Sequence, residues 1–360
     1  MFAFSGKGQG LKQFVDRYFH LVFIGLFFAL SVFLLFAPPI WDEDVYLRLA
    51  DHTLSNPSDM FPPMLSWVPQ PPLMWYLVAV FSPAPRLAPL VTSVFCVCFL
   101  FYACRRLYGG DVAKLASAAL VSTGSYLLFS LVVFPDGPVM NFMAVSALSF
   151  LCWVKLREQK FLLLLGFGLT LAAMSDYTAV PILSVTFLVW LVIIRKSFNW
   201  SRFFKLLGVV SAALLPLLIW INSLSQIYGN IAYHYSSVNN LFSDSMLLRL
   251  ALNLIYFGSY VVLLGGLPLI SWIRKPSFDL DSKLLLIYSA TVFTFFLFIT
   301  PLYAYANPPY NRYLLPIIPA LTVISARSLA KEKLHARFLI LLPQFICASA
   351  ISALILLSLL

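Results

Sequence analysis

Five of the fourteen acidic residues in this 360-residue chain lie in one stretch, between residues 38 and 76. Carboxylates that border long apolar runs are costly to place beside a membrane, so a catalytic or ion-binding use is the first hypothesis. The same acids also suit a solvated loop in which one acid caps a helix. Both interpretations stay open on charge alone. The five acids are Asp42, Glu43, Asp44, Asp51 and Asp59.

Three further polar residues are candidates because of their positions. Asp136 precedes Gly137 and Pro138 between two apolar runs, where it is either a helix cap or a ligand. Asp176 follows a run, 161–175, that covers only about 22 Å, so it lies inside the bundle in a polar cavity or caps the next helix. His234 lies in a loop rich in Tyr, Ser and Asn, where it either contacts a ligand or is solvated.

The composition identifies the class of protein that must position these residues. Hydrophobic residues make up 61% of the chain and charged residues 11%, with a mean hydropathy of +0.90. Soluble domains carry about a quarter charged residues, so we predict an all-α polytopic membrane protein. Two of the apolar runs are short for a span of about 20 residues. The eleven candidate spans are 18–37, 87–104, 112–134, 138–154, 161–175, 179–194, 203–221, 247–273, 284–301, 313–326 and 338–358.

The basic residues predict the orientation. With a cytoplasmic amino terminus, all but four of the 24 Lys and Arg residues fall on the inner side, the four exceptions being Arg48, Arg86, Arg249 and Arg312. This asymmetry is typical of multi-pass cell-membrane proteins, and it accounts for the net charge of +10 without nucleic-acid binding. The acids show the opposite bias, so we expect the chemistry on the extracytoplasmic face.

Several classes of site are excluded or disfavoured. The inner loops are too short for a nucleotide-binding domain, and neither a P-loop nor a GxGxxG pattern follows a strand-like segment. The first run, 18–37, is too long for a signal-peptide core and is followed by no small-residue cleavage site, so it is interpreted as a retained span. The five cysteines all lie in apolar runs and are interpreted as buried hydrophobic residues.

The first outer loop, 38–86, has a structure of its own. Between Trp41 and Ser55 the spacing predicts a short amphipathic helix, with Val45, Leu49 and Leu54 near one face and Asp44, Arg48 and Asp51 near another. A proline-rich connector follows, and Leu73–Phe81 predicts a second short helix that prolines end. The two helices would cover the outer ends of the spans and hold Asp42 and Glu43 over a cavity.

Six short segments share their order and spacing with one group of membrane enzymes: WDEDVYLRLA at 41–50, PQPPLMWYL at 69–77, RLAPL at 86–90, FPDGPVMNF at 134–142, YHY at 233–235 and NRYLLPIIPAL at 311–321. Together they resemble the GT-C membrane glycosyltransferases. The resemblance is to the glycosyltransferase family 39 type, the branch that holds protein O-mannosyltransferases and the aminoarabinose transferase of lipid A. It covers most of residues 1–330.

The resemblance implies transfer of a sugar from a polyprenyl phosphate to an acceptor hydroxyl, with inversion. It implies Asp42 as the general base and Glu43 as a residue that orients Asp42 or the sugar. Partial desolvation raises a carboxylate pKa toward the working range of a base. The donor phosphate needs cations, and Arg312, or less directly Arg86, would bind it. The remaining candidates for substrate contact are Asp136, Tyr313, Gln70, His234 and Asp176.

The alternatives and departures bear on these roles. Arg312 would otherwise be an interfacial anchor beside Tyr313. Gln70 stands where the group usually has Lys, and the SDYTAVP segment at 175–181 stands where many members have Lys-Gly, so donor type and phosphate contacts are open. Asp42 and Asp136 are a candidate pair for Mg²⁺ or Mn²⁺, although related enzymes differ in their need for metal. No cofactor is therefore assigned.

We predict one transmembrane domain over 1–360, with a second larger outer loop at 222–246 and no separate soluble domain. The expected partners are a polyprenyl-phosphate-linked sugar, membrane lipids, and an acceptor that is a lipid, a protein or a polysaccharide. Two other classes remain: a lipid-linked sugar flippase or transporter, and a non-catalytic subunit of a glycosylation complex. A transporter would favour an internal repeat and charges near the midplane, and the sequence shows neither.

Overall fold

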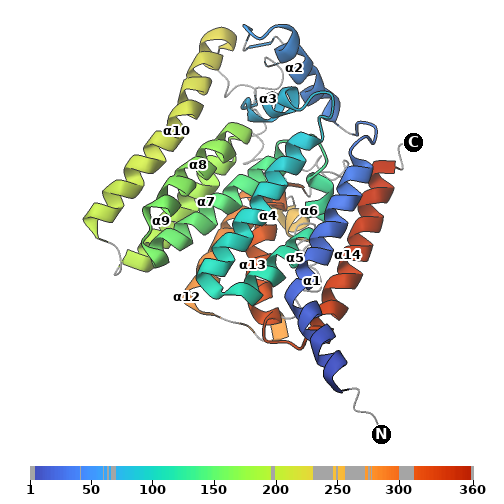
Figure 1. Ribbon diagram of the computed structural model, residues 1–360. Helices are drawn as coiled ribbons and strands as arrows, with labels where there is room; N and C mark the ends of the chain where they lie inside the picture. Colours follow the sequence, from blue (N-terminus) through green and yellow to red (C-terminus); the bar gives the residue numbers. More distant parts are fainter. Residues whose placement is uncertain are drawn as a thin grey trace.

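The computed structural model describes residues 5–40, 42–59, 61, 62, 65, 70–195, 199–229, 246–248, 250–255, 272–274, 276, 278–299 and 312–357, with the backbone alone for residues 5–17, 334 and 357. Every regular element in these ranges is a helix. Figure 1 shows most of the helices running side by side in one bundle. The predicted all-α class is confirmed.

The elements are, in chain order, α1 (Ser5–Leu34), α2 (Glu43–Ser55), α3 (Leu73–Val80), α4 (Leu87–Tyr108), α5 (Gly110–Val121), α6 (Gly124–Phe129), α7 (Asp136–Leu156), α8 (Gln159–Ser175), α9 (Ala179–Ile194), α10 (Trp200–Tyr228), α12 (Leu280–Ile299), α13 (Ile317–Leu329) and α14 (Leu334–Leu357). Within the described ranges, five helices are long and apolar enough to cross a membrane: α4, α7, α10, α12 and α14. The predicted span 247–273 lies mostly outside the described residues, so the count of eleven stays a prediction.

Helix α7 is the centre of the bundle. Of its most apolar 18-residue window, 83% is buried, against 22% for the peripheral α10. It packs most extensively against α8, and this approach is close because α8 presents Gly168. A Cβ atom there would lie 2.7 Å from Ser146 Oγ and 3.0 Å from the Phe142 carbonyl oxygen. The sequence of α7 is therefore almost continuously apolar because nearly all of its faces are covered.

The run 112–134 is not one helix, which corrects the prediction. It is divided into α5 and the short α6. The hydroxyls of Ser122 and Thr123 donate to the carbonyls of Ala118 and Ala119, at 2.6 and 3.0 Å. Side chains that bond back to the preceding turn offer the backbone an alternative to helix continuation. The break turns the chain, and α6 then packs on α14.

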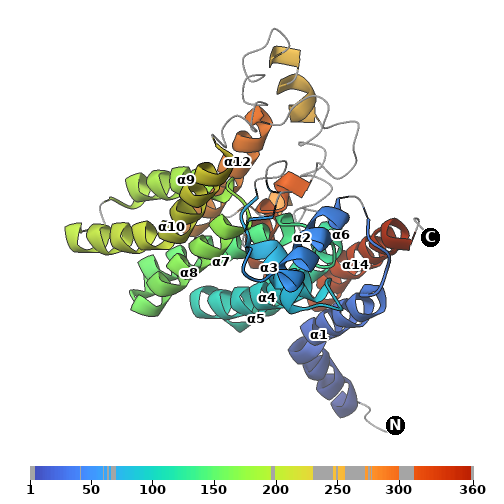
Figure 2. The same ribbon diagram turned by 90° about the horizontal axis from the view of Figure 1, so that it is seen from above.

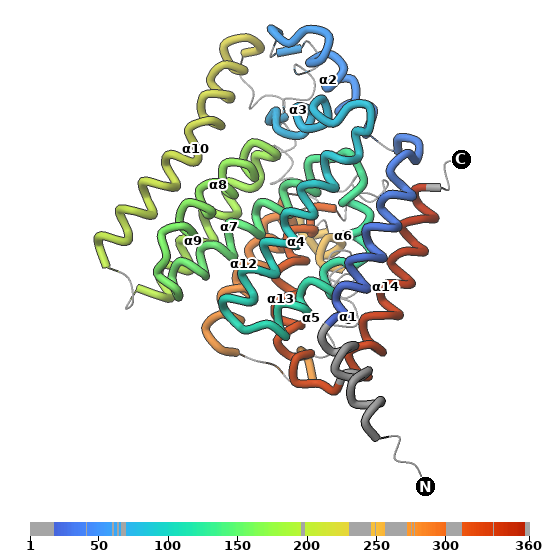
Figure 3. Tube along the Cα trace, in the orientation of Figure 1, coloured from blue at the N-terminus to red at the C-terminus, as the bar shows by residue number. Residues whose placement is uncertain are grey.

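The two predicted helices of the first loop are confirmed as α2 and α3. Figure 2, seen from above, shows them lying across the bundle, and the tube in Figure 3 follows the same loop over its upper end. The buried face of α2 is Glu43, Tyr46, Leu49 and Ala50. Leu54 was predicted near the same face as Leu49, but it is 49% exposed while Leu49 is buried.

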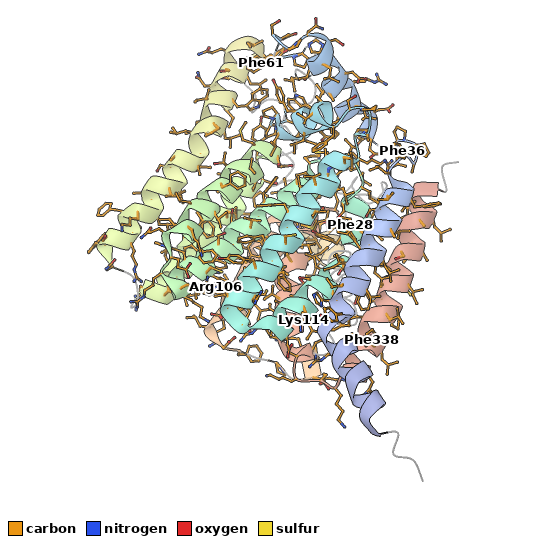
Figure 4. The ribbon with its side chains drawn as sticks, in the orientation of Figure 1. Phe28, Phe36, Phe61, Arg106, Lys114 and Phe338 are labelled. Carbon is orange, nitrogen blue, oxygen red and sulfur yellow. The ribbon has the colours of Figure 1, made fainter. Side chains whose placement is uncertain are left out.

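The far side of this loop is held by α10. The ring of Phe61 stacks on Trp220 with centroids 4.9 Å apart, and Figure 4 labels Phe61 at this end of the molecule. The Tyr228 hydroxyl lies 2.7 Å from the Phe61 carbonyl oxygen and 3.0 Å from that of Pro62. The described parts of the loop are thus fixed to the bundle at both sides.

Candidate active site

Glu43 joins three separate segments at the start of α2. It is fully buried, and its Oε2 accepts from the Ile40 amide at 2.6 Å and from Arg86 Nη2 at 2.8 Å. Its Oε1 accepts from the Val133 amide at 2.6 Å. Arg86 Nη2 also donates to the Pro38 carbonyl at 2.7 Å. Burial raises the pKa of Glu43, and the charge of Arg86 opposes that effect. Glu43 therefore anchors the start of α2, and its predicted role in orienting Asp42 or the sugar stays a prediction.

A buried ion pair lies just beyond this junction. Asp136 is the first residue of α7, and its Oδ2 lies 3.4 Å from Nε of Arg312, with side chains 10% and 15% exposed. Burial acts against the charge on Arg312, but the Asp136 carboxylate raises the pKa of that guanidinium overall. The positive end of the α7 dipole also favours a carboxylate at this position. The guanidinium of Arg312 therefore stays charged at the edge of the apolar core. Burial raises the pKa of Asp136, and the charge of Arg312 opposes that effect.

Aromatic rings enclose the guanidinium. Arg312 lies over the Phe134 ring at 4.6 Å and near the Tyr313 ring at 5.6 Å. Tyr313 in turn stacks on Phe296 of α12, with centroids 5.1 Å apart. A guanidinium packed against ring faces is held in one orientation and is partly shielded from water. The arrangement prepares Arg312 to meet an anion.

Asp176 completes this pocket. It ends α8, and its Oδ1 accepts from the Thr178 amide at 2.8 Å. Burial raises the pKa of Asp176 to about 6, and the nearby charge of Asp136 acts in the same direction. A carboxyl group with such a pKa exchanges protons near neutral pH. The described residues that line the pocket are Asp136, Val139, Asp176, Thr178, Phe296, Arg312, Tyr313 and Pro316.

Tyr46 connects this pocket to α2. It is 7% exposed, and its ring meets Phe134 edge-on with centroids 6.0 Å apart. Burial raises the pKa of Tyr46, and the charges that act on its phenol are those of Asp136, Arg312, Asp176 and Asp42. Of these four candidates, Asp136, Asp176 and Arg312 line the pocket and Asp42 does not. Asp42 itself is exposed, directly precedes α2 and makes no capping hydrogen bond with its side chain.

The other candidates lie elsewhere or are not described. Arg86 is bonded to Glu43, and neither residue lines the pocket. Gln70 precedes α3, and its buried Oε1 has no hydrogen-bond partner among the described atoms. It does not line the pocket either. His234 lies outside the described residues, as does most of the predicted loop 222–246.

The described residues fit a divalent ion poorly. Among them, no group of three or more His, Cys, Asp or Glu side chains could hold a metal. The Asp136 carboxylate of the candidate metal pair faces a guanidinium instead. Arg312 thus supplies positive charge where a metal would bind, so no step is derived through a metal.

Sequence reasoning missed Tyr46, Phe134 and Phe296. A signal for Tyr46 exists, because it follows Glu43 by three residues and therefore shares its face of α2. For the two phenylalanines there is none, since 33 phenylalanines occur in the chain and most positions of this kind face lipid or core.

Comparison with known proteins is consistent with the segments described above. Residues 61–220 match the family model described as dolichyl-phosphate-mannose-protein mannosyltransferase. This match includes α3 to α9 and the first part of α10, and with them Asp136 and Asp176. No curated protein matches the sequence.

Solved structures share the fold. ArnT from Cupriavidus metallidurans bound to undecaprenyl phosphate is 16% identical with a TM-score of 0.67, and the match covers 92% of this chain and 63% of that one. The same protein in the apo state has a TM-score of 0.65 at 15% identity, with 92% and 62% covered. The Archaeoglobus fulgidus oligosaccharyltransferase in the apo form has a TM-score of 0.51 at 16% identity, with 94% and 56% covered. The chain thus spans less than two thirds of the length of these proteins.

Proposed function

We propose that this chain, whose fold is that of the GT-C membrane glycosyltransferases, moves a sugar from a polyprenyl-phosphate donor to an acceptor hydroxyl. One observation carries the proposal: Asp136, Asp176 and Arg312 meet in one aromatic-walled pocket, and Phe134, which packs on Arg312, contacts Tyr46 of the helix that begins after Asp42. Further support comes from the family match over residues 61–220 and from the likeness to a protein bound to undecaprenyl phosphate.

The proposed step is a single displacement with inversion. Asp42 takes the proton of the acceptor hydroxyl, the hydroxyl oxygen attacks the anomeric carbon, and the bond from that carbon to the phosphate oxygen breaks. The polyprenyl phosphate leaves with the bonding electrons. Its developing charge is met by Arg312, which the rings of Phe134 and Tyr313 hold in place before the substrate arrives. Asp136 orients Arg312 or accepts hydrogen bonds from the sugar.

The pocket would face the extracytoplasmic side. Asp136 begins α7 and Lys155 and Arg157 end it, so acids and cations lie at opposite ends of one helix of 21 residues. Basic residues favour the cytoplasmic side, which supports an extracytoplasmic position for the amino end of α7. The lipid tail of the donor would enter sideways between helices. The acceptor is a hydroxyl of a lipid, a protein or a polysaccharide.

The test uses the full chain in lipid nanodiscs, with a panel of polyprenyl-phosphate sugars and mass spectrometry of the products. We expect Asp42→Asn to lower transfer by about 10²- to 10⁴-fold, the usual contribution of a general base. Donor binding should be unchanged. Asp44→Asn is the matched control, because Asp44 is an exposed acid two residues away whose ion pair, with Arg48, is 3.7 Å long.

Each other outcome has a distinct meaning. Equal activity of Asp42→Asn and wild type, with loss in Asp176→Asn, would move the base to Asp176. Continued movement of the lipid-linked sugar across the bilayer without transfer would indicate a flippase. If the wild type consumes no donor, and Asp42→Asn, Asp44→Asn and Asp176→Asn behave like it, the chain is a non-catalytic subunit.

A further inference from the structure

A second polar recess lies at the other end of α7. It is formed where the turn from α7 to α8 meets the start of α10. Its cations are Arg157, Arg202 and Lys205, and no acid is among its described lining residues. We call it the basal groove. With about 1.5 Å per residue, the 21 residues of α7 place it about 30 Å from Asp136. It is therefore separate from the pocket described above.

The local backbone concentrates positive charge in the basal groove. Arg157 ends α7 in the left-handed conformation, with φ of 62°. Asn199 caps α10 by accepting from the Arg202 amide at 3.0 Å, and the remaining amides of the first turn add the positive end of a long helix. The nearest acid in sequence, Glu158, is already paired with Arg106 and, at 2.7 Å, with Lys160. It does not neutralise the groove.

Exposed apolar side chains next to the basal groove favour a lipid as its ligand. Trp200 and Phe204 are 75% and 62% exposed, and both rings lie near the ring of Phe203 in one cluster. Exposed aromatic side chains of this kind settle at the boundary between membrane and water. Beyond them α10 presents exposed Leu207, Leu215 and Leu218, which suit contact with acyl chains.

We propose that the basal groove binds the phosphate headgroup of an anionic membrane phospholipid, with its acyl chains along α10. Lys and Arg side chains near the surface attract such headgroups, and recesses of this kind between helices hold them. The proposal is independent of sugar transfer. It has a structural purpose, because α10 is little buried yet holds the first loop through Trp220 and Tyr228. A lipid bound at its base stabilises the folded arrangement by mass action.

The experiment uses the purified full chain in neutral detergent. The thermal midpoint and the number of retained lipids, counted by native mass spectrometry, are measured with phosphatidylglycerol, phosphatidylcholine or inorganic phosphate. The groove variant carries Arg157→Gln, Arg202→Gln and Lys205→Gln together. The matched variant carries Arg105→Gln, Lys331→Gln and Lys333→Gln, which remove three exposed cations from the same end of the bundle.

We expect phosphatidylglycerol alone to raise the midpoint of the wild type and of the matched variant. The groove variant should bind it on the order of 100-fold more weakly, since each surface cation contributes about fivefold. Equal stabilisation by inorganic phosphate would overturn the lipid assignment. Equal losses in both triple variants, or no preference over phosphatidylcholine, would overturn the site. Should the groove variant not fold, Lys205→Gln against Lys331→Gln gives the same comparison, with a difference of about fivefold expected.

Discussion

Both ends of α7 lie near ion pairs between an arginine and an acid, but the pair is buried at one end and more exposed at the other. At its first turn, Asp136 and Arg312 are 10% and 15% exposed and lie among rings. At the basic end of the molecule, Arg106 and Glu158 pair with side chains 39% and 31% exposed. Exposed pairs contribute little, whereas buried charges depend on complete and well-placed partners. The charges at the first end therefore depend on well-placed partners, whereas the charges at the second end are stabilised mainly by water.

The largest expected effect comes from breaking the buried pair of Glu43 and Arg86. Arg86→Met would leave Glu43 buried without its cation, which costs about 3–5 kcal/mol of folding free energy. The matched change Arg106→Met removes the partner of an exposed acid and should cost much less, because solvent screens that pair. Thermal midpoints in detergent measure both. Similar small shifts in the two variants would contradict the distinction between the two ends.

The next effect compares two arginines that each pack on an aromatic ring at the same distance. Arg312 lies 4.6 Å from the Phe134 ring, and Arg327 lies 4.6 Å from the Tyr108 ring. Lysine keeps the charge but loses the planar, bidentate fork. Arg312→Lys should weaken binding of a polyprenyl phosphate by roughly 10- to 100-fold, while Arg327→Lys leaves it unchanged. Titration in nanodiscs checks this, and equal affinity of both variants would remove Arg312 from donor binding.

A glycine beside Asp136 gives a smaller effect on folding. A Cβ atom at Gly137 would lie 2.4 Å from the Phe129 carbonyl oxygen, so Gly137→Ala must displace backbone and should cost about 1–3 kcal/mol. Gly208 lies within α10, with nothing within 4 Å of the corresponding position. Gly208→Ala should stabilise by about 0.5–1 kcal/mol through helix propensity. Midpoints that shift in the same direction would show that the close approach at Gly137 does not constrain the fold.

The smallest effect is a difference in pH dependence between two carboxylates. Burial raises the pKa of Asp176 to about 6, so its contribution to stability is greatest below about pH 3.8 and declines as pH rises through 6. Partial exposure to the pocket limits this change to about 1–2 kcal/mol. Asp279 is the opposite case: hydrogen bonds from Arg327 lower its pKa, so its contribution is present at neutral pH and is lost toward acid.

Midpoints of Asp176→Asn and Asp279→Asn at pH 5 and pH 7.5 test the two signs. At pH 7.5, Asp176→Asn should be more stable than wild type and Asp279→Asn less stable. The gain of Asp176→Asn should shrink at pH 5. If Asp176→Asn shows the same pH dependence as wild type, the carboxyl group of Asp176 does not titrate in the folded protein as described.

Hydropathy predicted most of the bundle, because a helix in lipid must satisfy its backbone internally and present apolar side chains. It could not predict the break at Ser122 and Thr123, since hydroxyls that bond back to the preceding turn do not change the apolar character of the run. The predicted ends of the short helices α2 and α3 lie close to the observed ends, because prolines follow both helices in the sequence.

The candidate site was predictable only in part. The charges were visible because acids are rare in an apolar chain, and Asp136, Asp176, Arg312 and Tyr313 do line one pocket. The ion pair of Glu43 with Arg86 was not predictable from the sequence, because it joins residues 43 positions apart and depends on how α2 packs on the bundle. Nor did charge alone distinguish Asp42, which is exposed, from its buried neighbour Glu43.

Asp42 and Glu43 are adjacent in the chain, yet the first is exposed and the second is fully buried. Glu43 reaches its three donors with one methylene more than an aspartate has, and it fixes the backbone from which Asp42 projects. An interchange of the two residues would conserve composition and net charge, yet it would leave the shorter acid away from the Val133 amide and a longer, more mobile one at position 42. Neighbouring positions of identical charge thus have unequal tolerance to substitution, and the order Asp-Glu is itself part of the structure.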